Sequence, residues 1–226
     1  MTDVLERLRG GLVVSCQPVD NGPMDHPKIV AAMAQAAVNG GAAGLRIEGI
    51  ENLRAVRPLV DVPIIGIVKT DSDDTPVRIT VSKSDVSALT ESGADIVAYD
   101  ATDRPRKDPK EAILASILAN GAIAMADCST LVDARVAHAA GVAILGTTLS
   151  GYTAATETDG EGPDLELVRQ FRTLNAFVMA EGRVNTPSLA PDAMAAGADC
   201  VTVGSALTRL ELMTAAFVKK IQGRLQ

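Results

Sequence analysis

The chain has 226 residues, with 47% apolar side chains and a formal net charge of −7, which suits one domain with a sizeable core. The negative charge and an aromatic content of 2% argue against a nucleic-acid partner, because a polyanion needs a basic surface and stacked bases need aromatic platforms. No apolar run approaches the ~18 residues of a membrane span, so we expect neither a membrane anchor nor a signal peptide.

Eight short apolar runs alternate along the chain with segments of helical period. We expect the runs to form strands at residues 12–17, 44–48, 64–69, 96–100, 122–127, 143–147, 176–181 and 200–205. The clearest helices are expected at residues 29–38, 110–120, 134–140, 192–196 and 210–221. Strand followed by helix, eight times over, predicts an α/β protein, a (β/α)8 TIM barrel whose single domain spans residues 1–226.

Glycine and proline mark the boundaries of these units. Glycines that can end a helix in the left-handed conformation are Gly41, Gly93, Gly141 and Gly197. Prolines at expected helix starts, where a missing N–H costs nothing, are Pro27, Pro109 and Pro191. The longest stretches without hydrophobic periodicity lie at residues 21–26, 70–83 and 149–163. Each follows a predicted strand, so we expect them to be lids or binding loops over the carboxyl-end face of the barrel.

The carboxyl ends of all strands in a parallel barrel open onto one face, which carries the active site. The strand ends therefore bring five side chains to a common mouth: Gln17, Arg46, Lys69, Asp127 and Glu181. Lys69 follows five apolar residues, and partial burial beside a cation would lower its pKa, as a base or Schiff-base former requires. The alternative is a solvated lysine at a strand end.

Asp127 and Glu181 each end an apolar strand, where a carboxylate is costly unless it has a partner. Lys69 and Arg46 supply such partners at the same mouth, and Glu48 either pairs with Arg46 or faces outward. This pattern predicts catalytic groups, with a structural network of ion pairs under the loops as the alternative. Asp127 could also act only as a cap of the next helix.

Glycines and arginines follow the last two expected strands. Backbone N–H groups there, together with a helix start, can hold a phosphate, as barrels often do at this place. We therefore expect phosphate binding at Gly182, Gly204, Ser205 and Arg209, with Arg183 beside them. Ordinary turn glycines are the alternative.

Patterns for metals and redox cofactors are missing from the sequence. His26 lies in the first long loop and His138 on an outer helix, and neither has metal-ligand spacing with a strand-end carboxylate. No Gly-x-Gly-x-x-Gly run follows a strand, so we expect no catalytic metal and no nicotinamide cofactor. Cys16, Cys128 and Cys200 form no C-x-x-C pair, which predicts reduced, buried thiols in a cytoplasmic protein.

Seven segments follow one another in an order that is typical of one known family. They are residues 14–17 (VSCQ), 44–46 (GLR), 63–69 (PIIGIVK), 126–130 (ADCST), 146–153 (GTTLSGYT), 180–187 (AEGRVNTP) and 203–209 (VGSALTR). Through these segments the chain resembles the N-acylmannosamine-6-phosphate 2-epimerase family over nearly its whole length. The segments at 146–153 and 180–187 are the most specific.

The resemblance implies a barrel that acts on a small amino sugar phosphate without a metal or an organic cofactor. Lys69 would transfer the proton, with Glu181 as its partner carboxylate. The implied substrate-binding residues are Gln17, Arg46, Asp127, Tyr152 and Arg183. The implied reaction inverts C2 of N-acetylmannosamine-6-phosphate, giving N-acetylglucosamine-6-phosphate, in sialic acid and amino sugar catabolism.

This chemistry accounts for the residue types at the mouth. Removal of the C2 proton requires an open ring, a base such as neutral Lys69 and a cation such as Arg46 that stabilises the enolate. Two other hypotheses are a Schiff-base aldolase barrel that acts on a sugar phosphate and a non-catalytic barrel that binds one. The outer helices at residues 29–38 and 210–221 are candidate interfaces of a homo-oligomer, with a dimer favoured.

Overall fold

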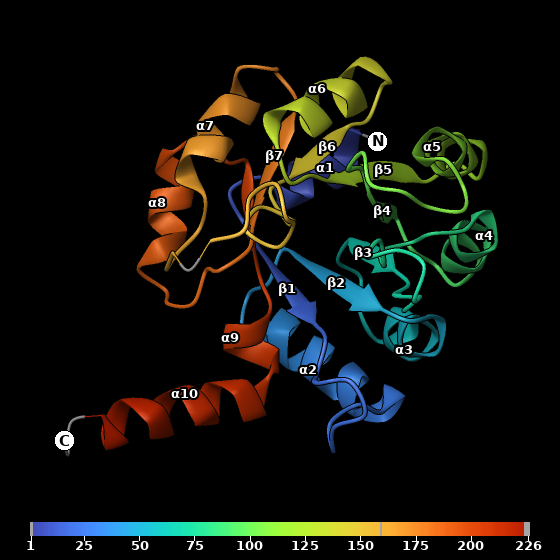
Figure 1. Ribbon diagram of the computed structural model, residues 1–226. Coiled ribbons are helices and arrows are strands. Elements are labelled where there is room, and N and C mark those ends of the chain that lie inside the picture. Colours follow the sequence, from blue (N-terminus) through green and yellow to red (C-terminus); the bar gives the residue numbers. More distant parts are fainter. Residues whose placement is uncertain (1, 159, 224–226) are drawn as a thin grey trace.

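Eight parallel strands close into a barrel in the computed structural model, which describes residues 2–158 and 160–223. Each strand pairs with the next, and β8 pairs with β1. The strands are β1 (Leu12–Cys16), β2 (Gly44–Glu48), β3 (Ile64–Ile67), β4 (Ile96–Asp100), β5 (Ile123–Asp127), β6 (Ile144–Gly146), β7 (Phe177–Glu181) and β8 (Cys200–Val203). The ring of strands inside a ring of helices (Figure 1) confirms the predicted (β/α)8 barrel.

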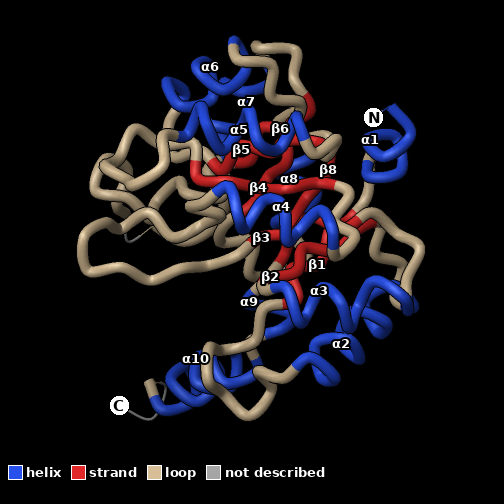
Figure 2. The backbone as a smooth tube through the Cα atoms, turned by 90° about the vertical axis from the view of Figure 1, so that its right-hand side faces the viewer, coloured by secondary structure: helices blue, strands red, loops and turns tan. Residues whose placement is uncertain are grey.

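The helices are α1 (Thr2–Leu8), α2 (Pro27–Asn39), α3 (Ile50–Val56) with the 3-10 turn η1 (Arg57–Leu59), α4 (Lys83–Glu91), α5 (Lys110–Ala119), α6 (Leu131–Ala139), α7 (Leu165–Arg172), α8 (Leu189–Ala195), α9 (Ser205–Thr208) and α10 (Leu210–Gln222). Helices α2 to α8 connect successive strands and cover the outside of the sheet. The long loops gather at the carboxyl ends of the strands, on the left of Figure 2, while α1 lies at the opposite end of the barrel. In both views α10 extends away from the other helices.

Four strands end earlier than predicted, at Cys16, Ile67, Gly146 and Val203. Beyond Ile67 the chain leaves the parallel ladder, and Lys69 pairs with Ile79 in an isolated antiparallel bridge. Gln17 and Lys69, which were predicted at strand ends, therefore lie within the first two residues of the loops that follow β1 and β3.

The helix boundaries also differ in detail from the prediction. Pro27 is the first residue of α2 as predicted, whereas Pro109 precedes α5 as its cap. Helix α8 begins at Leu189, so Pro191 lies inside its first turn, where the N–H has no helical partner in any case. Thr130 caps α6, which starts before the predicted residue 134. The four glycines predicted to end helices all have positive φ.

Side chains along each strand alternate between two cores, because successive residues of a strand point to opposite faces. Ile65, Met125 and Met179 belong to the cluster inside the barrel. The apolar residues next to them on the same strands belong to the cluster that packs under the helices. The same alternation, continued past the last core residue, brings Asp127 and Glu181 to the inner side. The fold thus aims strand-end side chains into the mouth.

The three cysteines are free and buried, as predicted: Cys16, Cys128 and Cys200. Among residues 2–158 and 160–223, no helix is both long enough and apolar enough to cross a membrane.

Candidate active site

A cavity of about 400 Å³ opens at the carboxyl ends of the strands. Every predicted site residue except Asp127 lies on its wall: Gln17, Arg46, Lys69, Tyr152, Glu181, Gly182, Arg183, Gly204, Ser205 and Arg209. The sequence-based expectation that these side chains share one mouth is therefore confirmed as a matter of position.

The cavity is cationic although the chain as a whole is acidic. Its cationic side chains are Arg46, Lys69, Arg78, Arg104, Arg183 and Arg209, against the carboxylates of Asp100 and Glu181. A concave wall with this excess of positive charge concentrates anionic ligands. The local charge thus favours a phosphorylated or otherwise anionic small molecule.

Arg46 lies at the centre of a buried ion-pair cluster. Its Nη1 and Nη2 donate to the Oδ1 and Oδ2 of Asp127 at 3.1 and 2.6 Å, and Nη1 also donates to Glu181 Oε2 at 3.1 Å. The side chain of Arg46 is 1% exposed and that of Asp127 is 0% exposed. A bidentate ion pair of this kind fixes the plane of the guanidinium, so Arg46 presents a fixed positive charge to the cavity.

Asp127 lies behind Arg46 rather than on the cavity wall. Its Oδ1 also accepts a hydrogen bond of 2.6 Å from Thr148 Oγ1. Both carboxylate oxygens of Asp127 accept hydrogen bonds from protein groups, so the geometry favours a positioning role for Asp127. Its predicted direct contact with substrate stays a prediction.

Lys69 is held by contacts of its main chain. Its backbone N–H donates to Glu48 Oε1 at 3.2 Å, so Glu48 neither pairs with Arg46 nor faces outward. Burial of the Lys69 ammonium, with Arg209 and Arg46 nearby, lowers the pKa of Lys69. The lysine therefore has a larger neutral fraction at neutral pH than an exposed lysine.

The pKa of Glu181, at the end of β7, is shifted in the opposite direction to that of Lys69. Burial raises the pKa of Glu181 to about 7, while Arg46 and Lys69 oppose that rise. Thr147 Oγ1 accepts from the Glu181 backbone N–H at 3.0 Å and donates to its carbonyl at 2.9 Å. These bonds fix the main chain at the strand end, and Arg46 holds the carboxyl group itself. A carboxyl group whose pKa is raised to about 7 can both give and take a proton near neutral pH.

The glycine-rich end of the cavity lies where β8 meets β1. Gly204 precedes α9, Arg209 Nε donates to the Gln17 carbonyl at 3.1 Å, and Gln17 Nε2 donates to Ser15 Oγ at 2.7 Å. The bond to the Gln17 carbonyl holds Arg209 at the cavity wall. The other nitrogens of its guanidinium have no hydrogen-bond partner among the described residues. The arrangement supports the predicted phosphate site without testing it.

Tyr152 belongs to the loop between β6 and α7, which crosses the barrel opening (Figure 1), whereas Arg183 follows β7 and contacts that loop. Arg183 donates to the carbonyls of Gly162 at 2.8 Å and Ser150 at 2.5 Å, and its guanidinium lies 5.7 Å from the centre of the Tyr152 ring. Arg183 thus ties both ends of this loop together. Its predicted contact with substrate, like that of Tyr152, stays a prediction.

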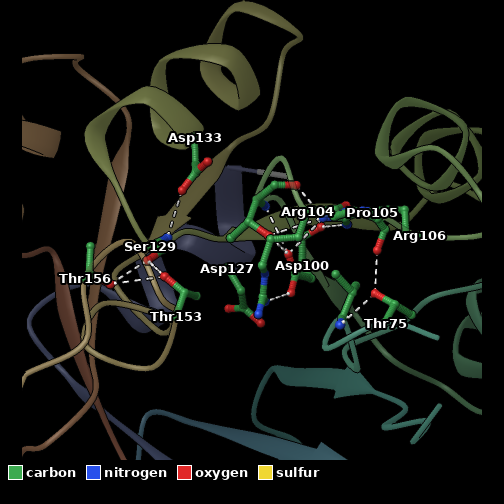
Figure 3. A network of polar contacts seen from close by, with 12 residues as sticks. Thr75, Asp100, Arg104, Pro105, Arg106, Asp127, Ser129, Asp133, Thr153 and Thr156 are labelled. Atoms are coloured by element: carbon green, nitrogen blue, oxygen red, sulfur yellow. Dashed lines mark hydrogen bonds and ion pairs between the residues drawn. The ribbon is translucent and has the colours of Figure 1, made fainter. Parts of the chain in front are cut away.

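A cluster of hydroxyl groups anchors the same loop to the barrel (Figure 3). Ser129 Oγ lies 2.6 Å from Thr153 Oγ1 and 2.7 Å from Thr156 Oγ1. Ser129 follows β5 and its N–H donates to Asp133 of α6. The loop is therefore fastened from two sides of the mouth.

Sequence reasoning missed Asp100 and the arginines around it. Asp100 ends β4, lies on the cavity wall and is paired with Arg104 at 2.5 Å and Arg106 at 3.1 Å. Asp100 ends an apolar strand with the same inward alternation as Asp127, and this signal was available in the sequence. Within residues 2–158 and 160–223, no cluster of three or more His, Cys, Asp or Glu side chains could hold a metal ion.

The fold and this cavity together define a barrel enzyme of the kind that handles small phosphorylated substrates at the carboxyl face. A family model described as "Putative N-acetylmannosamine-6-phosphate epimerase" matches residues 30–223. The chain belongs to this epimerase family, as its sequence segments led us to expect.

Individual relatives agree with this assignment. The chain is 56% identical to a "Putative N-acetylmannosamine-6-phosphate 2-epimerase" of Aliivibrio fischeri, over 96% of this chain and 92% of the relative. It is 53% identical to a protein of the same name from Haemophilus influenzae, over 97% and 96% of the two chains. The solved N-acetylmannosamine-6-phosphate 2-epimerase of Clostridium perfringens superposes with a TM-score of 0.91 at 35% identity, covering 95% of each chain.

Proposed function

We propose that the protein inverts C2 of N-acetylmannosamine-6-phosphate to give N-acetylglucosamine-6-phosphate. The observation that carries this proposal is the convergence of Lys69, Glu181 and Arg46 on one cationic cavity. The activity named for the relatives accounts for each group, because a 2-epimerase needs proton exchange at C2 and a cation for the charge that develops on the carbonyl oxygen.

In this proposal Lys69 and Glu181 act on the open-chain sugar from two sides. One of them removes the C2 proton, and the other returns a proton to the opposite face, so that no net proton is gained or lost. The lowered pKa of Lys69 and the raised pKa of Glu181 move both groups toward neutrality, where proton transfer in both directions is efficient. Arg46 stabilises the enolate oxygen in between.

Solvent exchange at C2 tests this mechanism. We expect NMR of the reaction in D₂O to show deuterium at C2 of the product, because lysine and carboxyl protons exchange with water. We also expect full activity after exhaustive treatment with EDTA. Product that keeps its C2 hydrogen quantitatively contradicts open proton exchange, and activity lost to EDTA and restored by a divalent ion contradicts the metal-free mechanism.

A Schiff-base aldolase is the second candidate, because the lowered pKa of Lys69 would also suit an amine nucleophile. Borohydride added with substrate separates the two reactions. An aldolase is inactivated irreversibly by reduction of its lysine adduct, whereas the proposed epimerase keeps its activity.

The phosphate of the substrate is proposed to bind at Gly182, Gly204, Ser205 and Arg209. We expect Arg209→Ala to raise KM for the 6-phosphate sugar far more than it lowers kcat, as loss of a contact made equally in ground and transition state does. Initial rates over a range of substrate concentrations measure both constants. Equal KM values of the wild-type enzyme for phosphorylated and unphosphorylated sugar would contradict this site.

We further propose that the protein is a homodimer joined through α10. No residue of α10 is buried, and its apolar side chains Leu210, Leu212, Phe217, Val218 and Ile221 are between 45% and 67% exposed. A helix of this length is marginal in water by itself, and an apolar face of this kind favours a protein interface, most simply with a second copy. By contrast, α2 buries Val30, Ala31 and Ala34 in its own barrel.

The mass in solution tests this interface. We expect light scattering after gel filtration to give twice the chain mass for the wild-type protein and a lower mass for the variant Phe217→Asp with Ile221→Asp. Val136→Asp on α6, which is 47% exposed, is the matched control and should leave the mass unchanged. A monomeric wild-type protein would contradict the dimer.

We also propose that the enzyme acts in the cytoplasm, in sialic acid and amino sugar catabolism. The three free, buried cysteines support a reducing compartment. The substrate named for the relatives supports the pathway.

A further inference from the structure

We propose that Arg104 is a further substrate-binding residue, which recognises the acylamino group on C2, and that Asp100 positions it. This inference rests on the proposed function, because it concerns the same substrate. It is carried by the geometry of the turn that follows β4.

Asp100 organises this turn from a buried position, where it is 1% exposed. Its Oδ1 accepts from the N–H of Thr102 at 3.0 Å and from Thr102 Oγ1 at 2.6 Å, and its Oδ2 accepts from Arg104 Nη2 at 2.5 Å. Figure 3 shows Asp100 close to Arg104 and Arg106 in this turn. A carboxylate with this many donors holds the turn in one conformation.

The two arginines of the turn are used differently. Arg106 donates through Nε to the Arg104 carbonyl and through Nη1 and Nη2 to Asp100 and Thr102, so its guanidinium is committed to the turn. Arg104 donates to Thr102 and Asp100 through Nε and Nη2 alone. Its Nη1 has no partner within the described part of the chain, and Arg104 lies on the cavity wall. One edge of a fixed guanidinium is therefore available to a ligand.

The position of Arg104 identifies the part of the substrate that it would meet. Strand β4 is four places from β8 in the closed barrel, so Arg104 lies across the mouth from the proposed phosphate site. A hexose chain held by its 6-phosphate at β8 therefore extends its C1 and C2 end toward β3 and β4. Lys69 follows β3, which lies between β8 and β4 in the ring of strands, and it has Arg209 nearby, so Lys69 lies between the proposed phosphate site and Arg104.

The surroundings of Arg104 suit an acyl group. Ile67, Pro76 and Ile79 line the cavity, and the Ile79 carbonyl accepts a hydrogen bond of 3.2 Å from the Asp100 N–H. An amide carbonyl could accept from Arg104 Nη1 while the acyl carbon chain contacts this apolar surface. Thr75 also donates to the Pro105 carbonyl, which ties the turn to the loop that begins beyond Lys69.

Binding of two non-reacting ligands tests the assignment. The first is the reduced, open-chain form of N-acetylglucosamine-6-phosphate, and the second is glucitol 6-phosphate, which has a hydroxyl at C2 in place of the acetamido group. We expect Arg104→Ala to weaken the acetamido ligand about tenfold to a hundredfold in calorimetry, as loss of a charged hydrogen bond does. Glucitol 6-phosphate should change less than about twofold. Arg209→Ala is the control and should weaken both ligands by the same factor.

Two more variants separate recognition from folding. Arg104→Gln removes the charge with a smaller loss of packing, and Asp100→Asn leaves Arg104 in place without its anchor. Both should lower the ratio of the affinity for the acetamido ligand to the affinity for glucitol 6-phosphate. A general loosening of the cavity would not change this ratio. If Arg104→Ala weakens both ligands equally, or neither, while the wild-type enzyme epimerises its substrate, this inference alone is wrong. If the wild-type protein shows no epimerisation and binds neither ligand, the proposed function fails and the inference with it.

Discussion

Replacement of Lys69 by alanine is expected to lower kcat/KM by at least about a hundredfold, since a positioned general base typically contributes ~10²–10⁴-fold. Lys69 is anchored through its main chain, by the bond from its N–H to Glu48 and by the bridge to Ile79. Truncation of the side chain leaves those contacts in place, so the fold should persist. Steady-state rates with N-acetylmannosamine-6-phosphate, together with circular dichroism, measure both effects.

The control is Lys83→Ala, at the exposed first residue of α4, which should keep wild-type rates within about twofold. Lys69→Met keeps most of the apolar stem and should be as inactive as Lys69→Ala, because it is the amine that matters. A Lys69→Ala enzyme with more than about a tenth of the wild-type rate would remove Lys69 from the role of base.

The sequence was sufficient to predict the barrel and the shared mouth because both follow from local patterns. Each strand is a short apolar run, and parallel strands necessarily present their carboxyl ends together. Alternation along the strands then determines which strand-end side chains point inward, as the series Met125 to Asp127 and Met179 to Glu181 shows. The same rule applied to Ala98 and Asp100 would have added the missed carboxylate.

The burial of each strand-end side chain and the identity of its hydrogen-bond partners could not be predicted from the sequence. Asp127 and Glu181 look alike in the sequence, yet Asp127 is fully buried and Glu181 keeps 13% of its side chain exposed. The difference arises from the stagger between strands and from the side chains of neighbouring loops, here Thr148, which contacts Asp127. Arg183 is a similar case, since its loop contacts depend on how the chain between β6 and α7 folds back.

The buried cluster around Arg46 should also dominate the effect of mutation on stability. We expect Arg46→Met to lower the free energy of unfolding by about 3–5 kcal/mol near pH 8, because it leaves the buried carboxylate of Asp127 and that of Glu181 without their cation. Urea denaturation measures this loss. Arg54→Met is the control, since Arg54 pairs with Glu51 at the surface with both side chains more than half exposed, and its expected cost is below about 1 kcal/mol.

The pH dependence distinguishes loss of charge compensation from loss of packing. Without Arg46, which opposes the rise in the pKa of Glu181, that folded-state pKa should rise further above its value in the unfolded chain, so the folded state binds more protons than the unfolded state. Stability of the variant should then fall as pH rises from the unfolded-state pKa of Glu181 to this raised value. In the wild-type protein the pKa of Glu181 is already raised to about 7 with Arg46 present. The stability gap between wild type and Arg46→Met should therefore be widest at pH 8 and narrower at pH 5. A gap that is constant over this range would mean that Arg46 stabilises the fold by packing its side chain rather than by its charge.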